Sequence, residues 1–127
     1  MKILLDTHIL SWFVDDSALL SETEKAQIEG DNDLRLSIAS LWEIAIKVSL
    51  GKLRLGLPLV ELMTRQLTSN GIAVLPITTG HVMRVASLPY HHRDPFDRII
   101  VSQAMVERIP ILSADAALDP YGITRLW

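Results

Sequence analysis

Four acidic side chains lie where a buried segment ends or a helix begins: Asp6, Glu43, Asp97 and Asp115. The apolar run "KILL" leads directly into Asp6, and "ILSA" leads into Asp115. Carboxylates that meet in one cleft repel one another, so a bound cation is needed to hold them together. Because the chain contains no cysteine, we expect a ligand set made of oxygens, which suits Mg²⁺ or Mn²⁺.

Such a site would suit the hydrolysis of phosphodiester bonds. One or two divalent cations can activate a water molecule and stabilise the leaving oxygen, so no side-chain nucleophile is required. The bound cations would also supply the positive potential that a chain of net charge −3 lacks for a nucleic-acid partner.

Patterns of apolar residues and helix caps predict the elements that must position these acids. Strands are predicted at Lys2–Leu5, Leu34–Ile38, Ile72–Ile77, Ile109–Leu112 and Ile123–Leu126. Helices are predicted at Thr7–Val14, from about Glu22 to about Glu29 after a capping box that begins at Ser21, from the cap Ser40 to about Leu50, from Pro58 to about Asn70, from Thr79 to about Leu88, and from Asp94 and Pro95 to about Glu107. A turn is predicted at Asp119–Gly122.

Alternating strands and helices predict a parallel sheet with right-handed crossovers. We therefore expect a three-layer α/β sandwich of about five strands, in one domain that covers residues 1–127. In such sheets ligands bind beyond the carboxyl ends of the strands. Asp6 and Asp115 follow strands, and Glu43 and Asp97 lie near helix N-termini that point to the same edge, so the four carboxylates are expected to converge.

Composition excludes several classes of protein. Without cysteine there is no disulfide framework or thiolate metal site, which fits a reducing compartment, and we expect a cytoplasmic protein. No apolar run approaches the roughly 20 residues of a membrane span, and the N-terminus does not have the pattern of a signal peptide.

Four blocks of sequence, in this order, resemble the PIN-domain ribonucleases, and most closely the toxins of VapBC-type toxin–antitoxin pairs. The blocks are "LLDTHILSWF", "SIASLWEIAIKVSLGKL", "HRDPFDRIIVSQA" and "ILSADAALDPYGITRLW". The resemblance extends from Lys2 to Trp127. It implies a five-stranded parallel sheet in the order 3-2-1-4-5.

The resemblance also implies a function. Proteins of this family are metal-dependent endoribonucleases that cut tRNA, rRNA or mRNA, are neutralised by an antitoxin encoded beside them, and commonly form homodimers. The family's acidic residues correspond to Asp6, Glu43, Asp97 and Asp115, which are therefore the expected catalytic and metal-binding residues. Thr7 matches a hydroxyl residue that often follows the first acid, and Asp94 and Ser113 are secondary candidates.

Each candidate also has a simpler structural interpretation. Asp6 and Asp94 can cap helices, Glu43 can pair with Lys47 one turn later, and Asp115 can be a turn residue. His91, His92 and Arg93 form a loop that can contact RNA or be merely solvated. Arg98 can meet RNA or an acid of the same chain. Lys47, Lys52 and Arg54 form a basic group that can contact RNA or be merely solvated. Trp12, Phe13, Leu41 and Trp42 are core or interface residues, or they form an antitoxin groove or a dimer surface.

Two other functions, and one variant of the nuclease hypothesis, are compatible with parts of the sequence. Phosphatases of the haloacid-dehalogenase type also begin with an apolar strand that ends in Asp, but they need a second Asp two residues later, where this chain has His8. A PIN-like binding module without catalysis would be favoured by loss of a main acid, and none is lost. DNA cleavage is a variant of the nuclease hypothesis.

Overall fold

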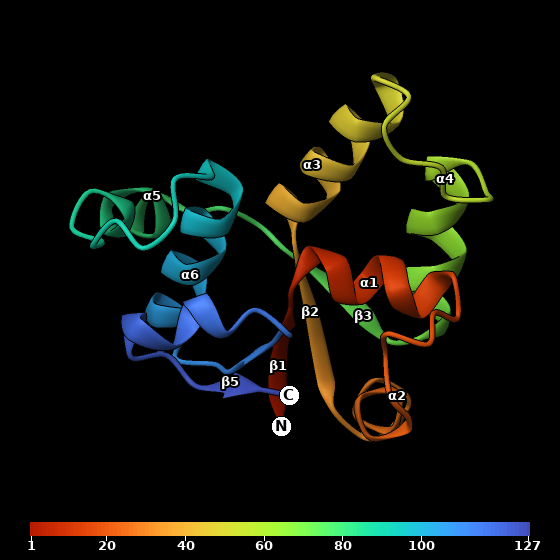
Figure 1. Cartoon of the computed structure of the whole chain (residues 1–127), viewed down its shortest axis with the longest axis horizontal. Coiled ribbons are helices and arrows are strands. Elements are labelled where there is room, and N and C mark those ends of the chain that lie inside the picture. Colours follow the sequence, from red (N-terminus) through yellow and green to blue (C-terminus); the bar gives the residue numbers. More distant parts are fainter.

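The computed structural model describes residues 1–127 and contains one five-stranded parallel sheet (Figure 1). Its order is β3-β2-β1-β4-β5, so the predicted fold class and strand order are confirmed. The strands are β1 (Lys2–Leu5), β2 (Asp33–Ser37), β3 (Ile72–Leu75), β4 (Ile111–Leu112) and β5 (Arg125–Leu126).

The central strand β1 divides the core between the two faces of the sheet. Ile3 and Leu5 pack into one apolar cluster, and Leu4 packs into the other. This division follows from the strand geometry, since successive side chains point to opposite faces. All three side chains are at most 1% exposed, which explains why the run shows no polar alternation.

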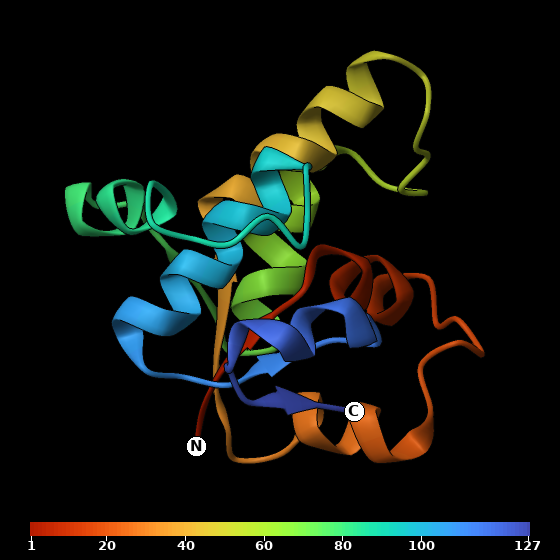
Figure 2. The ribbon, with the colours of Figure 1, turned by 60° about the vertical axis from the view of Figure 1, so that its left-hand side comes forward.

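Helices cover both faces of the sheet (Figures 1 and 2). On the face of Ile3 and Leu5 the cluster includes residues of α1 (Thr7–Val14), α2 (Glu22–Glu29), α3 (Ile38–Ser49) and the π-helical segment Leu62–Leu67, which continues α4 (Leu59–Glu61). On the face of Leu4 it includes residues of α6 (Pro95–Glu107), which packs against α5 (Thr79–Val85). Helix α3 also packs against α6, so the two helices that carry Glu43 and Asp97 are neighbours.

The start of α3 differs from the sequence prediction. Strand β2 ends at Ser37, and the Ser37 hydroxyl accepts a hydrogen bond from the backbone N–H of Ala39 at 3.0 Å. Ser37 is therefore the helix cap, and the prediction of Ser40 was wrong. Both serines are compatible with a cap, but the register that pairs Leu36 with Leu5 brings β2 to its end one residue earlier than expected.

Other element ends also differ. Strand β3 stops before Pro76 and β4 begins after Pro110, because proline has no N–H for the sheet. Ser21 occupies the predicted N-cap of α2 but makes no side-chain capping bond. Pro58 precedes its helix as the cap, and the predicted turn at Asp119–Gly122 lies mostly within a 3₁₀ helix over Ala116–Tyr121. Helix α5 ends at Val85 rather than near Leu88.

The two chain termini lie at the same end of the molecule, away from α3 (Figures 1 and 2). None of the helices is both long enough and apolar enough to cross a membrane.

Candidate active site

Asp6 lies at the carboxyl end of β1, as predicted, and both of its oxygens are engaged. Oδ1 accepts a hydrogen bond from the backbone N–H of Thr7 at 2.7 Å, and Oδ2 accepts one from the Ser113 hydroxyl at 2.7 Å. Asp6 is thus the N-cap of α1, but the bond from Ser113 fixes its carboxylate toward β4 as well. The capping interpretation and the site interpretation are therefore compatible.

Two hydroxyl residues tie the neighbouring elements together around Asp6. The Thr7 hydroxyl donates to the Ser40 hydroxyl at 2.8 Å and links α1 to α3. The Ser113 hydroxyl accepts from the backbone N–H of Asp115 at 3.0 Å while it donates to Asp6. Because Ser40 and Ser113 are fully buried, these bonds hold the edge of the sheet in a fixed geometry.

Glu43 projects from α3 and is only 8% exposed. Its Oε2 lies 3.1 Å from Nζ of Lys47, one helical turn later. The helical ion pair considered from the sequence is therefore formed. Since Glu43 is nearly buried, Lys47 balances a charge that has little contact with water.

Asp94 and Asp97 flank the start of α6 as the sequence indicates. Asp94 is the N-cap, and its Oδ1 accepts from the backbone N–H of Phe96 at 2.8 Å, with Pro95 at the first helical position. Asp97 lies in the first turn, half-buried. Because α6 leads into β4 and runs against the strands, its N-terminus lies at their carboxyl edge, where Asp6 also lies.

Replacing Asp94 with alanine is expected to lower the free energy of unfolding by about 1 kcal/mol, because the cap bond to Phe96 is lost. Urea denaturation at neutral pH measures the change. Asp94→Asn is the matched control, since asparagine removes the same charge but keeps a capping oxygen. Equal stabilities of the two variants would argue against the capping role.

The pKa of Asp97 is raised to about 6. Burial is the main cause, and the negative charges of Asp94, Asp6 and Glu43 raise it further, whereas His92 lowers it. The carboxylates that the sequence places far apart are thus close enough to repel one another. This repulsion adds to the effect of burial in raising the pKa of Asp97.

This raised pKa predicts how stability depends on pH without added metal. The folded pKa, about 6, lies above the unfolded value of 3.8, so the folded state binds the proton more tightly. The resulting stabilisation is complete below the unfolded pKa and is lost as the pH rises through 6. Asp97→Asn should therefore be more stable than the wild type at pH 7.5 in EDTA, by about 1 kcal/mol after allowance for partial exposure.

Urea denaturation of Asp97→Asn at pH 7.5 and at pH 4 tests this expectation, because the advantage should shrink at the lower pH. Asp31→Asn, in an exposed turn, controls for the loss of one negative charge. An Asp97→Asn protein that is less stable than the wild type at pH 7.5 would contradict the repulsion.

Asp115 has a different environment. Its Oδ1 accepts from the backbone N–H of Ala117 at 3.0 Å, and its Oδ2 lies 2.9 Å from Nε2 of His92, whose Nδ1 lies 3.1 Å from the Tyr121 hydroxyl. Burial raises the pKa of Asp115, but the bonds to His92 and Ala117 outweigh it and the net pKa is lowered. Asp115 also lines a small pocket of about 240 Å³ together with Asp6 and His8. Asp115 therefore lies near Asp6, but its carboxylate is engaged by His92 and by the backbone N–H of Ala117.

The predicted basic residues separate into two groups. Lys47 and Arg93 line one groove of about 450 Å³ together with Lys52, next to Glu43 and Asp94. His92 instead bridges Asp115 and Tyr121 and is mostly shielded from solvent.

Arg98 is buried, 6% exposed, and its guanidinium donates to the backbone carbonyls of Pro89 at 2.9 Å, Val85 at 3.2 Å and Leu88 at 3.3 Å. The guanidinium of Arg98 therefore has partners within the chain, and its contact with RNA stays a prediction. Its intramolecular partners are carbonyl groups, not the acid that was the alternative. These bonds hold the loop that carries His92 and Arg93.

The acidic residues suit a hard divalent cation in chemistry, since their ligand atoms are carboxylate oxygens, and burial together with neighbouring negative charges raises the pKa of Asp97. As they stand, no three acidic or histidine side chains lie close enough together to hold an ion directly. The structure therefore does not assemble the predicted acids into one direct ligand set, although Asp97 lies near Asp6, Asp94 and Glu43.

Several residues of this region have no signal in the sequence. His8 lies beside Asp6 and Asp115 in the small pocket, Tyr121 positions His92, and Ser40 receives the Thr7 hydroxyl bond. His8 follows Asp6 by two residues, and this spacing does not place both side chains on one face of a helix. The contacts of Tyr121 and Ser40 span 29 and 33 residues, so no local pattern indicates them.

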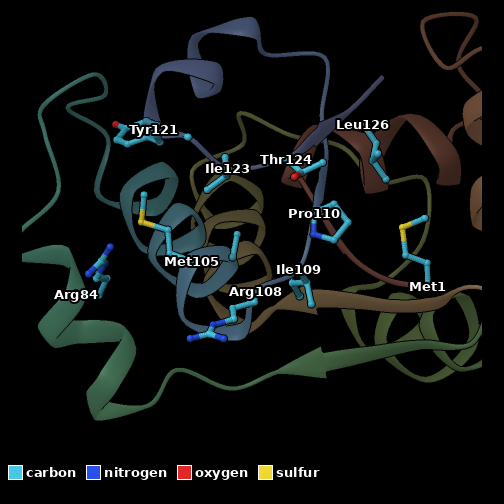
Figure 3. Close-up of a pocket in the computed structure, with 12 residues that line it drawn as sticks. Met1, Arg84, Met105, Arg108, Ile109, Pro110, Tyr121, Ile123, Thr124 and Leu126 are labelled. Atoms are coloured by element: carbon cyan, nitrogen blue, oxygen red, sulfur yellow. The ribbon is translucent and has the colours of Figure 1, made fainter.

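The largest cavity, of about 680 Å³, lies elsewhere and contains none of the acids (Figure 3). It is lined by Met1, by residues of α6 such as Met105, and by the segment from Tyr121 to Thr124, with Arg84 and Arg108 at one side. Met1 precedes β1, so this cavity is at the amino ends of the strands and is not part of the candidate site.

Comparisons with known proteins agree with this fold. VapBC2 from Rickettsia felis, in a structure bound to a DNA fragment from its promoter, matches with a TM-score of 0.77 and 14% identity over 99% of this chain and 98% of that chain. FitAcB from Neisseria gonorrhoeae matches with a TM-score of 0.73 and 18% identity over 98% and 96%. VapBC-1 from nontypeable Haemophilus influenzae matches with a TM-score of 0.67 and 14% identity over 99% and 97%.

At such identities the structural likeness establishes the fold alone, and no curated protein matches the sequence. The sequence itself does match a family, since residues 3–122 fit the PIN domain. That match covers the four acids and nearly the whole chain. The chain therefore belongs to the PIN domain family.

Proposed function

We propose that this protein is a metal-dependent endoribonuclease that hydrolyses RNA phosphodiester bonds with Mg²⁺ or Mn²⁺, and that it is the toxin of a toxin–antitoxin pair. Membership of the PIN domain family supports a nuclease. The group of Asp6, Glu43, Asp94 and Asp97 at the carboxyl edge of the sheet supports a site for a divalent cation.

The observation that carries the proposal is the convergence of acidic side chains at one edge of the sheet, where Asp97 lies half-buried near Asp94, Asp6 and Glu43. A half-buried carboxylate among three other negative charges is unfavourable by itself, and a bound cation would reverse that cost. Folded proteins tend to keep such arrangements where they bind or react.

In this proposal Asp6 and Asp97 would hold the cation. Glu43 would join them once the Lys47 ammonium moves from Glu43 to an RNA phosphate. Asp115 would act through a water molecule. The cation, when bound, lowers the pKa of a water molecule and stabilises negative charge on the phosphate. Ser113 and the backbone N–H of Thr7 keep the Asp6 carboxylate in place. Thr7 itself links α1 to α3 through Ser40 and so positions Glu43 relative to Asp6.

A PIN-like binding module without catalysis is the second candidate. It is favoured by the ion pairs Glu43–Lys47 and His92–Asp115, which already satisfy two of the four predicted ligands. Such a protein would bind RNA or a protein partner without cutting it.

The antitoxin and the homodimer are also proposals. The similar structures are of VapBC and FitAB proteins, which supports a protein partner for this chain. Expression of the toxin should stop growth of a bacterial host, and expression of an antitoxin from the neighbouring gene should restore it. Light scattering of the purified chain measures whether it forms dimers.

Incubation of the purified chain with total cellular RNA in Mn²⁺, in Mg²⁺ and in EDTA tests the nuclease. Asp6→Asn protein, prepared identically, controls for contaminating ribonucleases. Discrete fragments that need the metal and are absent with the variant would support the proposal, and sequencing their ends would identify the target. If folded wild-type protein leaves all RNA classes intact, including RNA from its own host, the binding module becomes the better description.

A further inference from the structure

The largest cavity of the protein lies at the amino ends of the strands, at the opposite edge of the sheet from the acids (Figure 3). We call it the amino-edge cavity. Its volume of about 680 Å³ lies within the range of pockets that hold small molecules, roughly 300–1,000 Å³. Most of its lining is apolar, with side chains of Met1, Met105, Ile109, Pro110, Ile123 and Leu126. The proposed nuclease mechanism uses none of these residues.

Two arginines border the amino-edge cavity. Arg84 lies in the last turn of α5, and Arg108 is the residue at which α6 ends. Figure 3 shows both toward one end of the cavity, away from Met1 and Leu126. Both side chains are exposed, and neither guanidinium takes part in an ion pair of the structure. The cavity thus has an apolar part and a cationic end.

The acids nearest in sequence do not neutralise these cations. Oε2 of Glu107 lies 3.7 Å from Nε2 of His81, and the Asp119 carboxylate accepts two bonds from Arg125, at 2.8 and 3.2 Å. No carboxylate lines the cavity itself. The charge of the cavity is therefore positive and is complementary to an anion.

The backbone of Arg108 also sets this residue apart. Its φ of 56° and ψ of 47° lie in the left-handed region, where glycine is the residue usually found at the end of a helix. An arginine in this conformation is strained, and such strain tends to persist at binding sites. The conformation therefore indicates a use for the side chain rather than for the fold.

The cavity wall opposite α6 is fixed without a ligand. The Tyr121 hydroxyl lies 3.1 Å from Nδ1 of His92, and the two rings stack with planes at 21°. Beyond Tyr121 the chain joins the sheet, where the backbone N–H of Ile111 donates to the carbonyl of Thr124 at 2.9 Å. Because these contacts already order the wall, little freedom would be lost on binding.

We propose that the amino-edge cavity binds a small amphiphilic anion, which has a carboxylate head and an apolar body like that of a medium-chain fatty acid. The carboxylate would pair with the guanidiniums of Arg84 and Arg108, since arginine binds carboxylates through charge-assisted hydrogen bonds. The apolar body would lie along Met105, Ile109 and Ile123. This inference does not depend on the proposed nuclease, because the cavity contains none of its acids.

Two features favour a small anion over a second copy of the chain. A symmetric partner would bring its own Arg84 and Arg108 against the same two cations, which would repel them. A concave apolar cavity with a few polar groups at one end is also the usual form of a small-molecule site.

Octanoate is the probe that tests the proposal, followed by NMR of protein labelled with ¹³C at the methionine methyl groups. The chain has four methionines, of which Met1 and Met105 line the cavity, whereas Met63 and Met83 are exposed outside it. Octanoate below its micelle concentration should shift the signals of Met1 and Met105 until they saturate, and should leave Met63 and Met83 unchanged.

Two matched compounds test the two parts of the ligand. 1-Octanol has the apolar body without the charge, and butyrate has the charge with a shorter body. Each should bind at least about tenfold more weakly than octanoate, because either the paired carboxylate or four buried methylene groups are lost.

Variants of the arginines test the cationic end. Arg84→Gln should weaken octanoate binding about tenfold and leave the binding of 1-octanol unchanged. Arg65→Gln, at an exposed arginine outside the cavity, is the matched control. Arg108→Gly removes the second guanidinium and suits the left-handed backbone, so it should stay folded and show a similar loss.

Three results would overturn the proposal. The first is a Met105 signal that does not move at any octanoate concentration, and the second is an equal shift of all four methionines, which indicates nonspecific binding. The third is wild-type affinity for octanoate in both Arg84→Gln and Arg108→Gly. A Met105 signal that moves with protein concentration alone, without octanoate, would instead assign the cavity to a contact between copies of the chain.

Discussion

Asp97→Asn protein is expected to cut RNA at least about a thousandfold more slowly than the wild type and to remain folded. A bound cation contributes several kcal/mol to a phosphoryl-transfer transition state, and about 1.4 kcal/mol corresponds to a factor of ten in rate. Asparagine keeps the size of the side chain but removes the charge that the cation requires. Single-turnover cleavage with saturating Mg²⁺ or Mn²⁺ measures the loss.

The same exchange should make the protein more stable in EDTA, because it removes an unfavourable charge. Loss of activity together with gain of stability distinguishes a functional carboxylate from one that supports the fold. Asp6→Asn should lose as much activity but gain less stability, since it weakens the bond from Ser113. A folded Asp97→Asn protein that cuts at the normal rate would eliminate Asp97 as a metal ligand.

Arg98→Met is expected to lower the free energy of unfolding by about 3 kcal/mol or more, the largest stability loss among the residues of this region. Three backbone carbonyls lose a charged donor, and each such bond contributes roughly 1.5–3 kcal/mol before water compensates. For a chain of this size the melting temperature should fall by about 10 °C. Thermal unfolding followed by circular dichroism measures the change.

Arg93→Ala is the natural comparison, because Arg93 is exposed in the loop that Arg98 holds through these carbonyls. This substitution should change the free energy of unfolding by no more than about 0.5 kcal/mol. The Arg93→Ala substitution should weaken RNA binding instead. An Arg98→Met protein as stable as Arg93→Ala would contradict the role of Arg98 in holding this loop.

The strands and helices were largely predictable because their signals are local. The run Ile3–Leu5 is buried on both faces, and the sequence Asp94-Pro95 begins α6 at the residue expected. Errors arose where two residues of the same type compete, as at Ser37 and Ser40, where the register of β2 with β1 decided the cap. Strands β3 and β4 are shorter than predicted because Pro76 and Pro110 have no N–H group for the sheet. The sequence could have indicated this.

The sequence by itself determined the fold class and the four acids at strand ends and helix starts, because apolar periodicity and capping residues act over a few positions. Only the tertiary structure decided how these groups are engaged. It pairs Glu43 with Lys47 and Asp115 with His92, places Asp97 where burial and neighbouring charges raise its pKa, and buries Arg98 against backbone carbonyls. Burial and contacts between distant segments set these properties, and neither is encoded in a local pattern.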